Sequence, residues 1–87
     1  MKKLKDILYR VTLESVVGNT AIAITDVHFD SRKASLNDVF VAIRGTQSDG
    51  HDYIEKAVAQ GALAIICEEM PEQIVNGITY VKVEDTS

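Results

Sequence analysis

The centre of this 87-residue sequence is the segment Asp38-Val39-Phe40-Val41-Ala42-Ile43-Arg44-Gly45. Residues 39 to 43 are all apolar and mostly β-branched or aromatic, which predicts a strand buried on both faces. Polar segments flank this strand, with Phe29-Asp30-Ser31-Arg32 before it and Thr46-Gln47-Ser48-Asp49-Gly50-His51 after it. An apolar strand with hydrogen-bonding groups gathered at its ends is typical of a ligand site in an α/β domain.

The segments after the central strand predict a strand–helix–strand unit. A helix is expected from about Gly50 to Gln60, with one apolar face and with Gly61 as its terminating residue. Ala62 to Cys67 is a second continuous apolar strand, so the two strands should be parallel and joined by a right-handed crossover. A loose turn of helix is expected over residues 70–75, and a last strand over residues 78–83.

The N-terminal third predicts one more helix and one more strand. Apolar residues at helical spacing (Leu4, Ile7, Leu8, Val11) indicate a short amphipathic helix over residues 2–10. From Ala21 to Phe29 the apolar residues alternate and then shift phase at Asp26-Val27, which indicates a strand with a bulge. We therefore expect one α/β domain over residues 1–87, with a small mixed or mostly parallel sheet of about four to five strands flanked by helices.

Composition excludes several classes of protein. Hydrophobic residues make up 46% of the chain and charged residues 25%, which is ordinary for a globular domain. The net charge of −4 gives no general basic field, so nucleic acid is not an expected partner. The single cysteine, Cys67, is expected to be a buried reduced thiol, which fits a cytoplasmic protein. No apolar run approaches a membrane span in length, so no membrane association is expected. Glu84 to Ser87 would begin a linker to a further domain.

Two polar segments are candidates for ligand contact. Asp30-Ser31-Arg32 offers a carboxylate, a hydroxyl and a guanidinium, and a guanidinium suits phosphate or carboxylate groups. The alternative is a turn in which Asp30 accepts backbone N–H bonds and pairs with Arg32. Thr46-Gln47-Ser48 offers two hydroxyls and an amide after Gly45; the alternative there is solvated surface.

The residues that begin the second helix have mainly structural interpretations. Asp49 should cap the helix, and Gly50 should allow a positive φ or a close backbone approach. His51 could act as an acid, a ligand or an anion contact, but a histidine at a helix start is more often structural. No metal site, nucleophile–base pair or phosphate loop is recognisable. The chain is therefore interpreted as a binding module without catalytic residues.

With these residues in place, the chain resembles the N-terminal domain of the Mur ligases, the ATP-dependent enzymes that build the peptidoglycan stem peptide. The resemblance runs from about residue 22 to residue 83. Its motifs are Asp30-Ser31-Arg32-Lys33, residues 38–45, Asp49-Gly50-His51-Asp52-Tyr53-Ile54, and Ala57 with Gly61-Ala62. Within the family, residues 41–46 and 48–51 are similar to the ligases that add the third residue (the MurE type). The ligases that add D-Ala-D-Ala share the Asp-Ser-Arg and Asp-Gly-His elements and are the nearest alternative.

The resemblance implies that this domain binds the uridine diphosphate end of UDP-N-acetylmuramoyl-dipeptide. Phe29 and Ser31 would then contact the uracil and ribose end, while Thr46, Gln47 and Ser48 would line the uridine diphosphate loop. The residues expected to shape this site are Asp30, Arg32, Arg44, Gly45, Asp49, Gly50 and His51. Leu36-Asn37 stands where the family usually has Pro-Gly, and because Asn tolerates the left-handed conformation the turn should be preserved.

The resemblance also implies what this chain lacks. ATP and Mg²⁺ are expected for the full-length enzyme, in central and C-terminal domains that are absent here, so the 87 residues alone should be inactive. The amino acid that the full enzyme adds stays open between diaminopimelate and lysine. A non-catalytic α/β interaction module without a nucleotide ligand is the alternative function.

Overall fold

The main sheet of the protein is mixed and mostly parallel. The computed structural model describes residues 2–44 and 49–84. Within them, five strands follow the order β2-β7-β6-β5-β4, with β4 to β7 parallel and β2 antiparallel at one edge. The strands are β2 Leu13–Val17, β4 Val27–His28, β5 Val39–Val41, β6 Ala64–Cys67 and β7 Thr79–Val83. The predicted fold class is confirmed.

A helical crossover joins the two central strands, as predicted. It begins with a 3₁₀ turn, η1 (Gly50–Tyr53), and continues as α2 (Ile54–Ala59), after which β6 pairs parallel with β5. Gly61 has a φ of +111°, and a Cβ there would lie 2.8 Å from the Leu36 Cα, so a glycine is required where the helix ends. Asn37, with a φ of 67°, adopts the left-handed conformation that its turn was expected to need.

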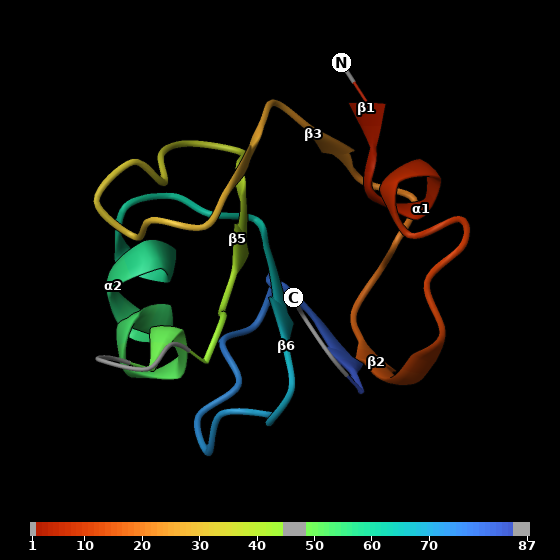
Figure 1. Ribbon diagram of the computed structural model, residues 1–87. Coiled ribbons are helices and arrows are strands. Elements are labelled where there is room, and N and C mark those ends of the chain that lie inside the picture. Colours follow the sequence, from red (N-terminus) through yellow and green to blue (C-terminus); the bar gives the residue numbers. More distant parts are fainter. Residues whose placement is uncertain (1, 45–48, 85–87) are drawn as a thin grey trace.

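Successive residues of the central strands face opposite sides of the sheet, and each side has its own core. One face packs with Ile54 and Ala57 of α2, and the other packs with Leu4 and Leu8 around α1 (Leu4–Ile7). Figure 1 shows α1 and α2 on opposite sides of the strands. The α2 face contains the strand residues Phe40, Ile65, Cys67 and Tyr80, with Ala42 directly after β5. Those of the α1 face are Val39, Val41, Ala64, Ile66, Val81 and Val83.

The N-terminal region differs from its prediction. The helix expected over residues 2–10 is wrong in extent, because residues 2–3 form a short strand, β1 (Lys2–Lys3), and α1 has only four residues. β1 pairs antiparallel with β3 (Ala23–Ile24) in a separate two-stranded sheet. The single strand expected over residues 21–29 is therefore two strands, β3 and β4. The phase shift at Asp26-Val27 marks the place where the chain passes from one sheet to the other.

Two further segments were not predicted correctly. No element was expected between residues 11 and 17, yet β2 forms there by pairing with β7. All five residues of β2 are exposed, so its sequence carries little burial pattern. The turn of helix expected over residues 70–75 is wrong: the segment is irregular, and the Val75 N–H donates to the Tyr80 hydroxyl at 3.1 Å.

Candidate functional site

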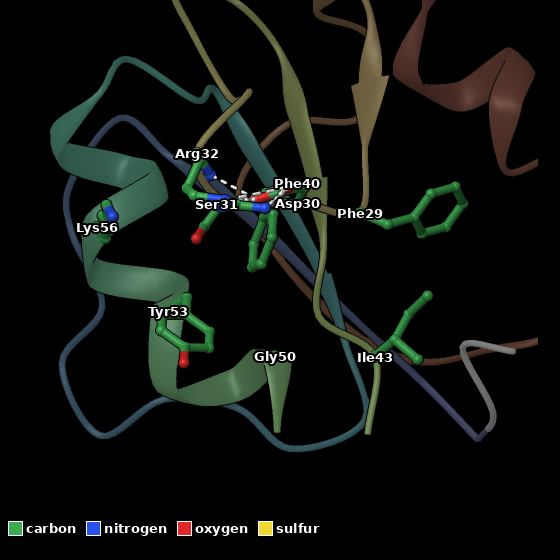
Figure 2. A pocket seen from close by; sticks show the side chains of 9 residues that line it. All are labelled: Phe29, Asp30, Ser31, Arg32, Phe40, Ile43, Gly50, Tyr53 and Lys56. Atoms are coloured by element: carbon green, nitrogen blue, oxygen red, sulfur yellow. Dashed lines mark hydrogen bonds and ion pairs between the residues drawn. The ribbon is translucent and has the colours of Figure 1, made fainter. Parts of the chain in front are cut away.

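A cleft of about 480 Å³ lies at the carboxyl ends of β4 and β5. Its walls come from the turn after β4, from β5 and the residues after it, and from η1 and α2 (Figure 2). Ligands of open α/β sheets bind outside the carboxyl ends of the strands, so the position is that of a binding site. The residues that line the cleft are Phe29, Asp30, Ser31, Arg32, Phe40, Ile43, Gly50, Tyr53 and Lys56.

Asp30 and Arg32 form an ion pair with each other at this cleft. The Arg32 Nη2 lies 2.8 Å from the Asp30 Oδ2, and the Arg32 backbone N–H donates to the Asp30 Oδ1 at 2.9 Å. The side-chain hydrogen bonds from Arg32, followed by this backbone bond, lower the pKa of Asp30 to about 2. Of the two interpretations of this segment, the structure shows the turn with its internal ion pair. The Arg32 guanidinium is engaged by its own neighbour.

Ser31 lies in the cleft with only 7% of its surface exposed. The Gln60 side-chain amide donates to the carbonyl oxygens of Ser31 and Ala34, which ties the turn after β4 to the end of α2. Among residues 2–44 and 49–84, the Ser31 hydroxyl has no hydrogen-bond partner. Figure 2 shows this hydroxyl directed into the space between the Phe40 ring and α2. The group is thus held in place through its backbone and left available to a ligand.

Phe29 occupies the edge of the cleft. Its side chain is exposed, and Figure 2 shows the ring directed away from Ser31, Tyr53 and Lys56. An exposed aromatic ring beside a cleft offers a face on which a planar base can stack. Phe29 and Ser31, both expected to contact ligand, thus line one cleft, but the Phe29 ring is directed away from the side of the cleft that holds the Ser31 hydroxyl.

Asp49, Gly50 and His51 form the start of η1, as expected. The Asp49 carboxylate caps the turn by accepting the His51 N–H at 2.9 Å. This backbone bond is the main reason that the pKa of Asp49 is lowered. Gly50 lies against the end of β5, where a Cβ would be 2.7 Å from the Ile43 nitrogen. Both structural predictions, the cap and the close approach, are confirmed.

His51 links the start of η1 to the segment after β6. Its Nε2 accepts the backbone N–H groups of Glu68 and Glu69 at 3.0 and 3.2 Å. We assign the ring proton to Nδ1 from this bonding, because Nε2 must be an acceptor; Nδ1 then donates to the Asp49 Oδ1 at 2.7 Å. His51 does not line the cleft. Of its proposed roles, the structural one fits these contacts.

Arg44 does not line the cleft either, but forms bonds with residues beside it. Its Nη2 pairs with the Glu69 Oε1 at 2.7 Å, and Arg44 and Asp49 form an isolated antiparallel bridge. These two residues bracket the segment that was expected to form the uridine diphosphate loop. The predicted site residues Gly45, Thr46, Gln47 and Ser48 lie outside the described part of the chain.

Four residues of the cleft were not among the predicted site residues: Phe40, Ile43, Tyr53 and Lys56. The buried Phe40 contributes apolar surface, and Tyr53 and Lys56 contribute a hydroxyl and an ammonium group. A signal for the last two was present, because positions 50, 53 and 56 recur at the three-residue spacing that puts side chains on one helix face.

The described residues offer no metal centre and no membrane span. Within residues 2–44 and 49–84, no group of three or more His, Cys, Asp or Glu could hold a metal ion. No helix in the same part of the chain is long and apolar enough to cross a bilayer.

Comparison with known proteins identifies the family. The family model described as "Mur ligase family, catalytic domain" matches residues 23–85. The chain belongs to the Mur ligase family, which confirms the resemblance seen in the sequence.

Within the family, the chain is similar to the N-terminal region of MurE-type ligases. It is 46% identical over 84 residues to the UDP-N-acetylmuramoyl-L-alanyl-D-glutamate–2,6-diaminopimelate ligase of Bacteroides fragilis, covering 97% of this chain and 17% of that protein. The enzyme of the same name from Clostridioides difficile is 42% identical over 84 residues, with the same coverage. The chain thus spans about 17% of the length of these curated relatives.

Solved structures of another Mur ligase share the fold. A crystal structure of MurF from Acinetobacter baumannii matches with a TM-score of 0.65 and 32% identity, covering 72% of this chain and 13% of that one. MurF from Thermotoga maritima, in complex with ADP, matches with a TM-score of 0.60 and 38% identity, covering 70% of this chain and 14% of that one.

Proposed function

We propose that this chain is the substrate-binding domain of an ATP-dependent ligase of peptidoglycan biosynthesis. In this proposal the cleft beside Ser31 receives the uridine diphosphate end of UDP-N-acetylmuramoyl-L-alanyl-D-glutamate. The observation that carries the proposal is Ser31, a residue with only 7% of its surface exposed, whose hydroxyl opens into the cleft and has no partner in the described residues. A hydroxyl that opens into a cleft and is not bonded by the protein can donate a hydrogen bond to a ligand and accept one from it.

The architecture around the cleft supports a binding role. The Gln60 amide ties the turn after β4 to the end of α2, and the Asp30–Arg32 pair and the Asp49 cap hold each wall through local bonds, so both walls are fixed by bonds within the protein. A rigid site loses less conformational entropy on binding than a loop that must first become ordered. The expected contacts of Thr46, Gln47 and Ser48 with the ligand stay a prediction from the sequence.

The reaction of the parent enzyme would be formation of an acyl phosphate on the D-glutamate carboxylate, followed by attack of an amine. Binding energy from the remote uridine diphosphate would position that carboxylate for chemistry elsewhere. ATP and Mg²⁺ would act in the central and C-terminal domains, which this chain does not include. The 87 residues should therefore bind substrate without catalysing, and the parent enzyme should act in the cytoplasm.

The comparisons favour diaminopimelate as the amino acid added by the parent enzyme. The diaminopimelate ligases are 46% and 42% identical to this chain over nearly its whole length, whereas the two MurF structures are 32% and 38% identical over less of it. An assay of the parent ligase with diaminopimelate, lysine and D-Ala-D-Ala tests this choice. Turnover with lysine or D-Ala-D-Ala alone would contradict it.

Titration of the 87-residue chain with UDP, followed by backbone amide shifts, tests the binding proposal. We expect weak, saturable shifts around Ser31, Tyr53 and Lys56, because the sugar and peptide of the natural substrate would be held by the other domains. ADP, with the same charge but a different base, is the matched control and should bind more weakly. The absence of shifts with UDP would favour the alternative, an interaction module without a nucleotide ligand.

A further inference from the structure

The charged side chains that line the cleft have a net positive charge. Its lining includes one carboxylate, Asp30, and two cations, Arg32 and Lys56. Asp30 and Arg32 neutralise each other in their ion pair. Lys56 forms no ion pair with any residue in 2–44 or 49–84. The cleft therefore carries one uncompensated positive charge, although the whole chain has a net charge of −4.

The polar groups that share the cleft with Lys56 are suited to bind an anion. Tyr53 lies one turn before Lys56, and Ser31 faces both from the turn after β4 (Figure 2). Two hydroxyls and an ammonium group supply hydrogen-bond donors, while the one carboxylate of the lining already accepts bonds from Arg32. Donors without competing acceptors, next to an unpaired cation, favour a negatively charged ligand.

We propose that Lys56 binds the phosphate groups of the nucleoside diphosphate in this cleft, and that it makes ligand charge a determinant of affinity. This inference rests on the proposed function and assigns a residue to it. From the sequence, Arg32 was a candidate for phosphate contact, with pairing to Asp30 as the alternative, and in the structure its guanidinium is occupied by Asp30. The ammonium group of Lys56 interacts as a compact point charge with three donors, so it can follow phosphate oxygens without fixed bidentate geometry.

The test compares the dissociation constants of uridine, UMP and UDP for the 87-residue chain by amide-shift titration. For the unmodified chain, affinity should rise with each phosphate, and added salt should weaken UDP binding while leaving uridine binding unchanged. Lys56→Gln should lower the affinity for UDP about three- to tenfold and leave that for uridine unchanged. Lys56→Arg, which keeps the charge, should retain most of the UDP affinity.

Lys5→Gln is the matched control, because it removes the same charge from α1, on the other side of the sheet. Equal losses of UDP affinity in the Lys5 and Lys56 variants would show an effect of net charge only and overturn the proposal. So would a Lys56→Gln variant that loses uridine and UDP affinity in the same proportion.

The failure of this inference differs from the failure of the proposed function. If uridine and UDP bind the unmodified chain equally well, Lys56 has no phosphate role, yet the uridine site stands. If neither binds, the proposed function fails, and this inference fails with it.

Discussion

The amide of Gly50 packs directly on the backbone of Ile43. The Gly50 N–H donates to the Ile43 carbonyl at 2.8 Å, and a Cβ at position 50 would lie 2.7 Å from the Ile43 nitrogen and 2.9 Å from its oxygen. Both neighbours are backbone atoms of the residues that follow β5, so they cannot rotate away as a side chain can. The contact fastens the first turn of η1 to the end of β5, and both residues line the cleft.

Gly50→Ala should destabilise the domain, because the added methyl group forces these two backbone segments apart. The expected loss is about 1–3 kcal/mol in the free energy of unfolding, as for other overpacked sites. Urea denaturation followed by circular dichroism measures it. The control is Gly77→Asn, because no heavy atom lies within 4 Å of an added Cβ there, so its loss of stability reflects only the backbone strain at a φ of +89°, which Asn bears better than most residues. If the two variants lost the same free energy of unfolding, the close contact of Gly50 with the Ile43 backbone would not be the cause of the loss.

The Asp30–Arg32 pair should be visible in the titration of Asp30. Its pKa is lowered from 3.8 to about 2, chiefly by side-chain hydrogen bonds from Arg32. A group with a lowered folded-state pKa stabilises the fold above its unfolded pKa. The contribution of Asp30 should therefore be complete above pH 3.8 and lost as the pH falls towards 2.

A carboxyl titration by NMR checks this value. Arg32→Gln should return the Asp30 pKa towards 3.8. Lys33→Gln removes the same charge but should move the pKa much less, because the Lys33 charge is the smallest of the contributions to the shift. If the Lys33 variant moved the pKa as far as the Arg32 variant, the direct bond to Arg32 would not be its cause.

Ser31→Ala should separate a binding role from a structural one. In the parent ligase we expect KM for the UDP-sugar substrate to rise roughly three- to tenfold with little change in kcat, because one neutral hydrogen bond contributes about 0.5–1.5 kcal/mol and lies remote from the reacting carboxylate. The melting temperature should not change, because the bonds from Gln60 reach the Ser31 carbonyl and not its side chain. A lower melting temperature with an unchanged KM would instead assign Ser31 to the turn alone.

The Cys67 thiol should be unreactive in the folded protein. Cys67 is fully buried, and burial raises the pKa of its thiol to about 11, so almost no thiolate is present at pH 8. A chromogenic disulfide reagent should react fully with the unfolded chain in guanidinium chloride and only very slowly with the native chain. Rapid, complete labelling in native buffer would show that β6 is more accessible than the structure indicates.

Local patterns predicted the crossover and the turns well. The apolar runs of β5 and β6, the Asp49 cap, and the positive φ values at Asn37 and Gly61 all follow from residues close together in sequence. These features depend on backbone conformation and short-range hydrogen bonds, which individual residue types determine strongly.

Features that depend on distant partners were harder to predict. β2 exists because β7 pairs with it, and its five exposed residues show no buried face that could reveal the pairing. The proposed role of Lys56 was hard to predict from the sequence for a related reason. The sequence left open whether Arg32 pairs with Asp30, and the structure shows that it does and that Lys56 is the unpaired cation of the cleft.

The pairing of β2 with β7 joins opposite ends of the described chain, with Leu13 beside Val83. During synthesis, the N-terminal partner of this pair leaves the ribosome long before the C-terminal one exists. The last parallel strand and the edge strand can therefore join the sheet only when nearly all of the described residues have emerged. Until then β6 lacks its last partner strand, and the apolar residues of its edge are protected only when later translation supplies β7.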